Sequence, residues 1–495
     1  MTAIDSTQTP AAKTHWPSIF QFALSLFGAL GLWVIALLYL LSSLIQFLSP
    51  GIDIALTISS ISKTLGIFLL GILLLPSAGF ALLRIVGRSD ISKQLLDKTN
   101  KFVRPAWLIL LLPIILLIGF WVAGWNNLAL VFLPPLFILG AALPVLWLLW
   151  LGQRDLPAGS PQRQWGLFAV ALTIGPFIML VLEILVSIAI LVIAILAFPA
   201  LFAQIYQILP ADLDTLSTNP AIIDELISPL VSEPGIIALL MLFLSGFVPL
   251  IEELLKPIGV WLLAHRKLTP AEGFTAGLIS GSAFALFETL TRSTEPESWS
   301  LFVVVRIGTA AMHIFTTGLM GWAIAGVFSE KRYLRLVASY LLATTIHGLW
   351  NAAPVLFSVA FINYTFDAGL SFPSHFIISA PIFLLYLTLA AFTLIVYINR
   401  RFNRAQPPGR RFQSPSGFLE RLTGVEGSLV GRQPGASRVV GVAFGFAKPL
   451  MRLAQTAVRR VQRTADLLAV IFRLVERLSL ARRAERQAVG ERSRS

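Results

Sequence analysis

The sequence contains no cysteine at any of its 495 positions. This absence excludes disulfide bonds, thiol nucleophiles and zinc or iron–sulfur sites with cysteine ligands. Charge is also scarce: Asp, Glu, Lys and Arg make up 13% of the residues, about half the share found in a typical soluble domain. Hydrophobic residues make up 56% of the chain and gather in long runs up to residue 399. The chain is therefore expected to be an integral membrane protein with several spans.

The hydrophobic runs predict an all-α fold, a polytopic bundle of about ten transmembrane helices. The expected spans are 18–48, 64–86, 105–123, 128–151, 166–206, 235–264, 271–291, 300–328, 334–360 and 375–399. The run 166–206 is long enough for two spans, but two spans there would invert the side of every later basic loop. We therefore predict one long helix, kinked or tilted near Gly175-Pro176.

Basic residues concentrate in alternate loops, and this pattern predicts which loops face the cytoplasm. The loop 84–104 is rich in Lys and Arg, which marks it as cytoplasmic. Alternation from this loop places the N-terminus, residues 1–17, and the tail from residue 400 in the cytoplasm. The connection 207–234 has acidic residues and no Lys or Arg, so we expect it outside.

The tail carries most of the excess positive charge of the chain. Residues 400–448 are rich in Gly, Pro, Ser and Arg and are expected to be a linker. Beyond them, in 449–495, apolar residues recur at spacings of mostly three and four with arginines between them. This pattern predicts a basic amphipathic helix on anionic lipids, with a coiled-coil partner or a disordered tail as alternatives. No nucleic-acid partner is expected.

Two carboxylates and an ammonium interrupt the hydrophobic run 235–264, in the sequence Glu252-Glu253-Leu-Leu-Lys256. An ionised side chain at the centre of a transmembrane helix costs about 2.5–3.5 kcal/mol on insertion scales, so such residues indicate a functional site. Glu252 and Glu253 precede Lys256 by four and three positions, which lets both carboxylates reach its ammonium group. Adjacent carboxylates do not both ionise easily, so one is expected to keep a proton and act as an acid. The alternative is a structural ion-pair network.

The next three predicted spans also carry polar groups in their interiors. These are Glu288, then Arg306 and His313 two turns apart, then His347 and Asn351 one turn apart. Singly, each has an ordinary explanation as a hydrogen bond between helices. Their concentration in neighbouring spans instead predicts that they face one another and the acidic pair.

These residues carry a family resemblance. The motifs Glu252-Glu253-x-x-Lys256, Phe284-x-x-x-Glu288, His313 in its own span and His347-x-x-x-Asn351 resemble those of the PrsW-type intramembrane proteases, relatives of the CAAX-processing (ABI) peptidases. The resemblance covers about residues 235–360 and implies a catalytic membrane core there. Residues 18–206 would be additional N-terminal spans and 361–399 the last span. A prokaryotic cytoplasmic membrane fits the family.

The resemblance also implies the reaction and the roles of the residues. In this family a glutamate activates water to hydrolyse a peptide bond, so the expected substrate is a membrane protein or peptide. Carried over, it implies Glu252 or Glu253 as general base and His313 as its partner on the water. It further implies His347 and Asn351 as stabilisers of the oxyanion. Lys256 would orient the acids, and Glu288 would bind water or the substrate backbone.

Other protease chemistries fit the sequence less well. No aspartate lies within a predicted span, which excludes a membrane aspartyl dyad, and no His-Glu-x-x-His motif is present. We favour water activation without a cofactor. A divalent metal such as zinc remains an alternative, because donors of suitable type are present at Glu252, Glu253, Glu288, His313 and His347. A proton-coupled transporter and a catalytically silent membrane scaffold are the alternative functions.

Overall fold

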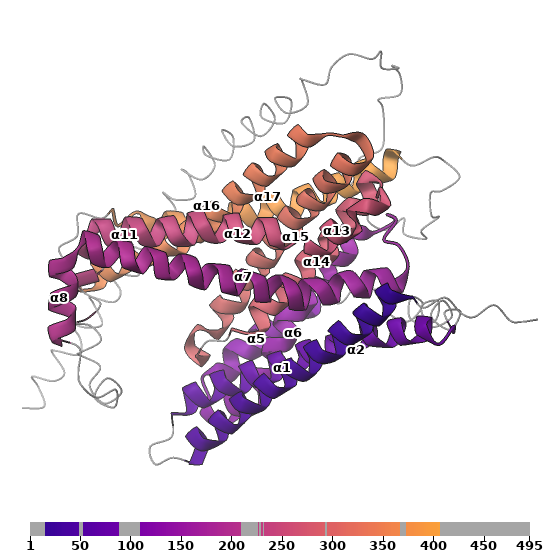
Figure 1. The fold of residues 1–495 in the computed structure, drawn as a ribbon. Coiled ribbons are helices and arrows are strands. Elements are labelled where there is room, and N and C mark those ends of the chain that lie inside the picture. Colours follow the sequence, from indigo (N-terminus) through magenta and orange to yellow (C-terminus); the bar gives the residue numbers. More distant parts are fainter. Residues whose placement is uncertain are drawn as a thin grey trace, which may run out of the picture. The chain divides into compact units, whose positions relative to one another are not determined.

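Figure 1 shows the computed structural model of the chain, which describes residues 15–48, 53–88, 109–208, 226, 229–230, 232–292, 295–366 and 373–405. Within these residues the fold is helical and contains no strand. The chain divides into two units, Met1–Gln413 and Ser414–Ser495, and all described residues lie in the first. The predicted linker beyond residue 405, the amphipathic helix 449–495 and most of the acidic connection 207–234 lie outside the described residues.

The helices follow the hydrophobic runs of the sequence. They are α1 (Trp16–Leu48), α2 (Ile54–Ile85), α5 (Leu111–Ala123), α6 (Asn126–Gln153), α7 (Pro161–Ala197), α8 (Pro199–Ile208), α11 (Pro234–Met241), the π-helix η1 (Leu242–Phe247), α12 (Val248–Leu255), α13 (Ile258–Leu263), η2 (Ala264–Arg266), α14 (Pro270–Leu290), η3 (Pro296–Ser298), α15 (Trp299–Glu330), α16 (Tyr333–Phe366) and α17 (Phe376–Ala405). In the described part, nine helical segments are long and apolar enough to cross a membrane. The all-α polytopic prediction is thus confirmed.

Four of the predicted spans differ from the observed helices. The predicted span 64–86 starts too late, because α2 already begins at Ile54. The run 105–123 contains α5, which at 13 residues is shorter than a membrane-crossing helix. The run 166–206 forms one long helix as predicted, but this helix ends at Ala197 and α8 starts at Pro199, because proline favours the first turn of a new helix. The run 235–264 is not one continuous helix, since it is divided among α11, η1, α12 and α13.

The ends of the helices that were predicted to face the cytoplasm lie at one side of the bundle. Gln162 Nε2 donates to Ser18 Oγ (2.7 Å), which joins the start of α7 to the start of α1. Arg163 pairs with Glu272 at the start of α14 (3.2 Å). Asn399 Nδ2, near the end of α17, donates to the carbonyl oxygen of Arg154 (2.8 Å). These contacts place the starts of α1, α7 and α14 and the ends of α6 and α17 at the same side.

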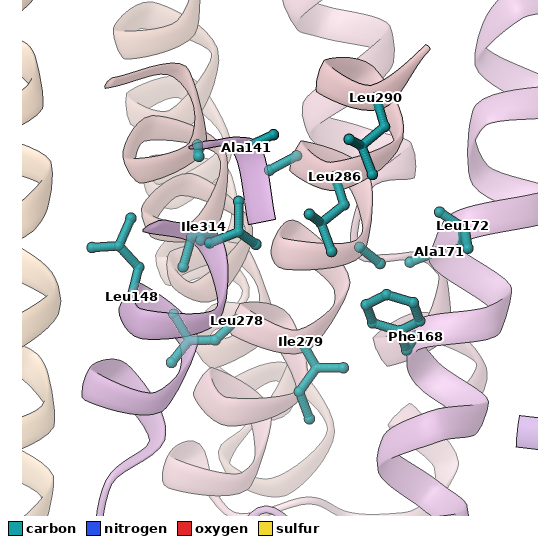
Figure 2. Close-up of a cluster of buried hydrophobic side chains, with 14 of the residues drawn as sticks. Ala141, Leu148, Phe168, Ala171, Leu172, Leu278, Ile279, Leu286, Leu290 and Ile314 are labelled. Atoms are coloured by element: carbon teal, nitrogen blue, oxygen red, sulfur yellow. The ribbon is translucent and has the colours of Figure 1, made fainter. Parts of the chain in front are cut away.

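Helix α14 lies at the centre of the core. Figure 2 shows Leu278 and Leu286 of α14 among Phe168 and Leu172 of α7, with Ala141 and Leu148 of α6 nearby. On its other side α14 packs against α15 with the two backbones in contact. The approach is so close that a Cβ atom at Gly277 would collide with the Thr317 carbonyl oxygen. This close packing brings the polar groups of α14 and α15 together.

Candidate active site

The acidic pair lies on a helix that two prolines interrupt. Pro249 has no N–H group, so it cannot donate to the carbonyl of Ser245 in an α-helix or to that of Leu244 in a π-helix. The π-turn η1 forms directly before it. Asn351 Nδ2 of α16 donates to the freed Leu244 carbonyl (2.9 Å), and Gly348 of α16 lies against the carbonyl of Ser245. Helix α16 thus compensates for the break.

The second interruption comes directly after Lys256. Helix α12 ends at Leu255, and Pro257 precedes the short helix α13. Trp261 Nε1 donates to the Leu254 carbonyl (3.1 Å), and Tyr340 Oη of α16 donates to the Leu250 carbonyl (2.8 Å). The two turns of α12 that carry the charged residues are therefore held at both ends by side chains.

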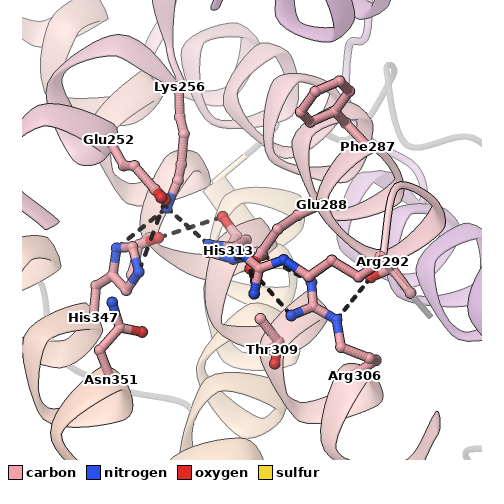
Figure 3. A network of polar contacts seen from close by, with 12 residues as sticks. Glu252, Lys256, Phe287, Glu288, Arg292, Arg306, Thr309, His313, His347 and Asn351 are labelled. Carbon is pink, nitrogen blue, oxygen red and sulfur yellow. Dashed lines mark hydrogen bonds and ion pairs between the residues drawn. The ribbon is translucent and has the colours of Figure 1, made fainter. Parts of the chain in front are cut away.

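The amine of Lys256 lies at the centre of the site. Its Nζ atom is 2.7 Å from Glu253 Oε1, 3.0 Å from Glu252 Oε2, 2.7 Å from His313 Nδ1 and 3.3 Å from His347 Nδ1. Figure 3 shows this amine between groups from α12, α15 and α16. The Lys256 side chain is fully buried. An ammonium group has only three hydrogens, so it cannot donate a full hydrogen bond to all four acceptors at once.

The two imidazoles are held differently. His313 Nδ1 faces the lysine ammonium and must accept, so its proton is on Nε2, which donates to Glu288 Oε2 (2.7 Å). Both nitrogens of His313 are therefore engaged. His347 Nδ1 lies 2.9 Å from Glu253 Oε1, whereas His347 Nε2 is 3.8 Å from Glu252 Oε2. The Nε2 atom of His347 is thus turned toward Glu252 without a close bond to it.

Glu288 connects His313 to two arginines. Arg306 Nη1 donates to Glu288 Oε1 (3.1 Å) and Arg306 Nη2 lies 2.8 Å from Oε2. Arg306 Nε also donates to Thr289 Oγ1 (3.1 Å). The exposed Arg292 pairs with Glu288 Oε1 at 3.2 Å. Glu288 orients His313 through these bonds, which is how carboxylates outside a reactive group fix an imidazole.

Two carboxylate oxygens of the site remain without a hydrogen bond among the residues that the structure describes. These buried atoms are Glu252 Oε2, whose approach to Lys256 is an ion pair only, and Glu253 Oε2. Buried polar atoms are rarely left unsatisfied. Both oxygens can therefore accept a hydrogen bond from a donor other than the described side chains, such as a substrate N–H group or water.

Glu252, His313 and His347 also form a possible ligand set for a metal ion. Each offers one ligand atom, and these atoms lie within 4.8 Å of one another. One carboxylate and two imidazoles are the protein ligands of several catalytic zinc sites. The donor types therefore fit a zinc ion, although the amine of Lys256 lies among the same donors.

All the residues predicted for the site lie in the described part of the chain. Through Lys256, His313 and Glu288, the groups around the acidic pair are connected to Arg306. The side chain of Asn351 is bonded to the Leu244 backbone carbonyl and not to this network. The sequence analysis missed Arg292, although its position four residues after Glu288 was a signal for pairing. It also gave no role to Glu183 of α7, whose charge interacts with those of Glu252 and Lys256.

A comparison with protein families supplies the assignment of this region. The model of the PrsW family intramembrane metalloproteases matches residues 164–387. Over these residues the chain is similar to the PrsW family. The PrsW match is wider than the expected 235–360 and includes α7 and the first part of α17. No curated protein and no solved structure matches the chain.

The PrsW match and the long apolar helices indicate an integral membrane protein with an intramembrane protease core. The match thereby favours the protease over the transporter and the scaffold that the sequence left open. The substrates expected for such a core are membrane proteins. The matched family is described as metalloproteases, which supports the alternative of a zinc ion at this site.

Proposed function

We propose that this PrsW-type core hydrolyses a peptide bond of a membrane-associated protein with water activated by Glu252. The observation that supports Glu252 is the contrast within the acidic pair. Glu253 has no exposed surface and bonds Lys256 and His347. The Glu252 side chain is 12% exposed, and its Oε2 lies 3.0 Å from Lys256 Nζ as an ion pair. A base must reach the proton that it removes, so Glu252 is the better candidate and Glu253 the anchor of Lys256.

The remaining groups fit the steps of amide hydrolysis. Glu252 takes one proton from water while the oxygen attacks the peptide carbonyl carbon, and the proton then passes to the leaving amine as the C–N bond breaks. His347 donates its Nδ1–H to Glu253, so its Nε2, which faces Glu252, donates to the oxyanion only when the imidazole carries both protons. The second N–H of Asn351 is the other oxyanion donor. His313 orients Lys256 instead of meeting the water, because both of its nitrogens are engaged.

A zinc ion bound by Glu252, His313 and His347 would supply a Lewis acid for peptide hydrolysis, and Glu252 would then be a ligand in place of the base. The chain itself would still position the groups around it, with Glu288 holding His313 and Glu253 holding His347. We further propose that the protein lies in a prokaryotic cytoplasmic membrane with both termini in the cytoplasm. The relation to CAAX-processing peptidases remains a prediction.

Cleavage of a transmembrane peptide by the full chain in lipid vesicles tests this proposal. Glu252→Gln should lower kcat by about 10²- to 10⁴-fold, the usual contribution of a general base, with a thermal stability close to that of the wild type. Glu253→Gln should lower both activity and stability, because it weakens the buried ion pair of Lys256. Glu330→Gln, at the exposed end of α15, is the control and should cleave normally. Unchanged cleavage by Glu252→Gln would refute the assignment.

A further inference from the structure

We propose that Lys256 is the resident cation of this cluster and that it excludes a divalent metal ion from Glu252, His313 and His347. A metal enters only when the lysine amine withdraws, so Lys256 sets the metal affinity of the site. The inference concerns the same site as the proposed function. It does not depend on proteolysis, because it concerns which cation the donors hold.

The size of the cluster supports this inference. The four acceptors lie 2.7–3.3 Å from Lys256 Nζ, which are hydrogen-bond distances. Zinc binds imidazole nitrogen at about 2.0–2.1 Å, so two such nitrogens are separated by at most about 4.2 Å. The ligand atoms of the candidate metal set lie within 4.8 Å of one another. The distances around Lys256 Nζ are those of an ammonium site and exceed zinc–ligand distances of about 2.0–2.2 Å, so the donors must move inward to hold zinc at the position of the amine.

The surroundings of the amine favour a cation at this position. Both carboxylates of the acidic pair contact Lys256, and its amine lies 4.8 Å from the centre of the Phe284 ring. Aromatic faces attract cations, most strongly where water is excluded. Without a cation, Glu252 and Glu253 would be buried next to each other with no opposite charge on α12. The donors thus need one positive charge, which Lys256 supplies from within the chain.

A divalent ion and the ammonium group cannot occupy the donors together. Each contact of Lys256 in this cluster is made to a residue of the metal set or to Glu253, so the amine uses the acceptors that a metal needs. Two cations a few ångströms apart in a buried site also repel each other strongly. Removal of the amine should therefore increase the affinity for zinc.

Zinc binding to the full chain in lipid nanodiscs tests the proposal, with zinc itself as the probe. The decisive variant is Lys256→Met/Glu253→Gln, which removes the amine and one carboxylate together and keeps Glu252, His313 and His347. The two substitutions are combined because Lys256→Met alone leaves a buried carboxylate without a compensating charge and is at risk of misfolding. Glu253→Gln alone is the matched control, since it keeps the amine in place. Bound zinc per chain is measured against buffered free zinc.

The double variant should bind one zinc ion per chain on the order of a hundredfold more tightly than Glu253→Gln or the wild type. Adding His347→Ala should abolish this gain, because it removes a ligand. Equal affinity of the double variant and Glu253→Gln would overturn the proposal. A gain that survives His347→Ala would also overturn it, because the zinc would then lie elsewhere. Neither result depends on cleavage, so failure here is distinct from failure of the proposed function.

Discussion

Helices α1 and α14 both qualify by length and composition as membrane spans, yet their surroundings are opposite. In the most apolar 18 residues of α1, 17% are buried inside the protein, whereas in α14 the share is 89%. The more buried helix is the less hydrophobic of the two. Lipid accepts apolar side chains as readily as a protein interior does, so hydrophobicity does not decide which helix is central. Small and polar residues decide it instead.

A related contrast separates α1 and α2 from the helices that form the polar site. Helices α1 and α2 present large apolar side chains outward, such as Phe27, Leu38 and Phe68. Helices α12, α14, α15 and α16 turn charged and polar groups toward one another. The outer faces of α1 and α2 are therefore suited to contact with lipid, while the facing sides of α12, α14, α15 and α16 hold charges away from lipid. Three predictions test this division.

The largest effect is expected where the helix backbones touch. Gly277→Val introduces side-chain atoms against the Thr317 carbonyl, so it should destabilise the fold by about 1–3 kcal/mol or more and abolish cleavage by displacing α15. Gly31→Val in α1 is the control, because nothing lies within 4 Å of a Cβ atom there, and its stability should change by less than about 0.5 kcal/mol. Thermal unfolding in detergent measures both. Equal effects would remove the distinction between the two helices.

A smaller effect is expected from an acid that acts through its neighbour. Glu288→Gln keeps the shape of the side chain but loses the charge that holds His313 and Arg306. We expect kcat to fall about 10- to 100-fold, as for other groups that orient an imidazole, with little change in KM. A rise in KM at constant kcat would instead assign Glu288 to substrate binding. The control is Glu330→Gln, whose partners Arg332 and Arg335 lie at the exposed end of α15.

The smallest effect is expected from loss of a bond to the backbone. Asn351→Leu and Asn399→Leu each remove a side-chain donor to backbone carbonyls, those of Leu244 and of Gly152 and Arg154 respectively. Both should lose about 1–3 kcal/mol of stability. Only Asn351→Leu should also lower kcat, because it removes the proposed oxyanion donor as well as the bond to Leu244, which lies two turns before Glu252. Parallel stability and cleavage assays check this, and normal cleavage by Asn351→Leu would show that the π-turn tolerates the loss.

The sequence predicted much of this site because charge is so rare in the spans. Glu252, Glu288, His313 and His347 stand out against apolar neighbours, and a polar group in lipid needs a partner. The prolines at 249 and 257 were equally visible, but the π-turn between Leu242 and Phe247 was not predicted. Its formation depends on Asn351 and Gly348 of another helix, and no local pattern reports such a partner.

The sequence by itself determined the class of protein, the order of the helices and the residues that had to find polar partners, because hydrophobic length and intramembrane charge are local properties. Only the tertiary structure decided that the Lys256 amine lies among both carboxylates and both imidazoles, and that Glu288 fixes the proton of His313. Those relations depend on how closely α14 and α15 approach and on where α12 is interrupted. Distances between helices arise from packing, which the linear order of residues does not contain.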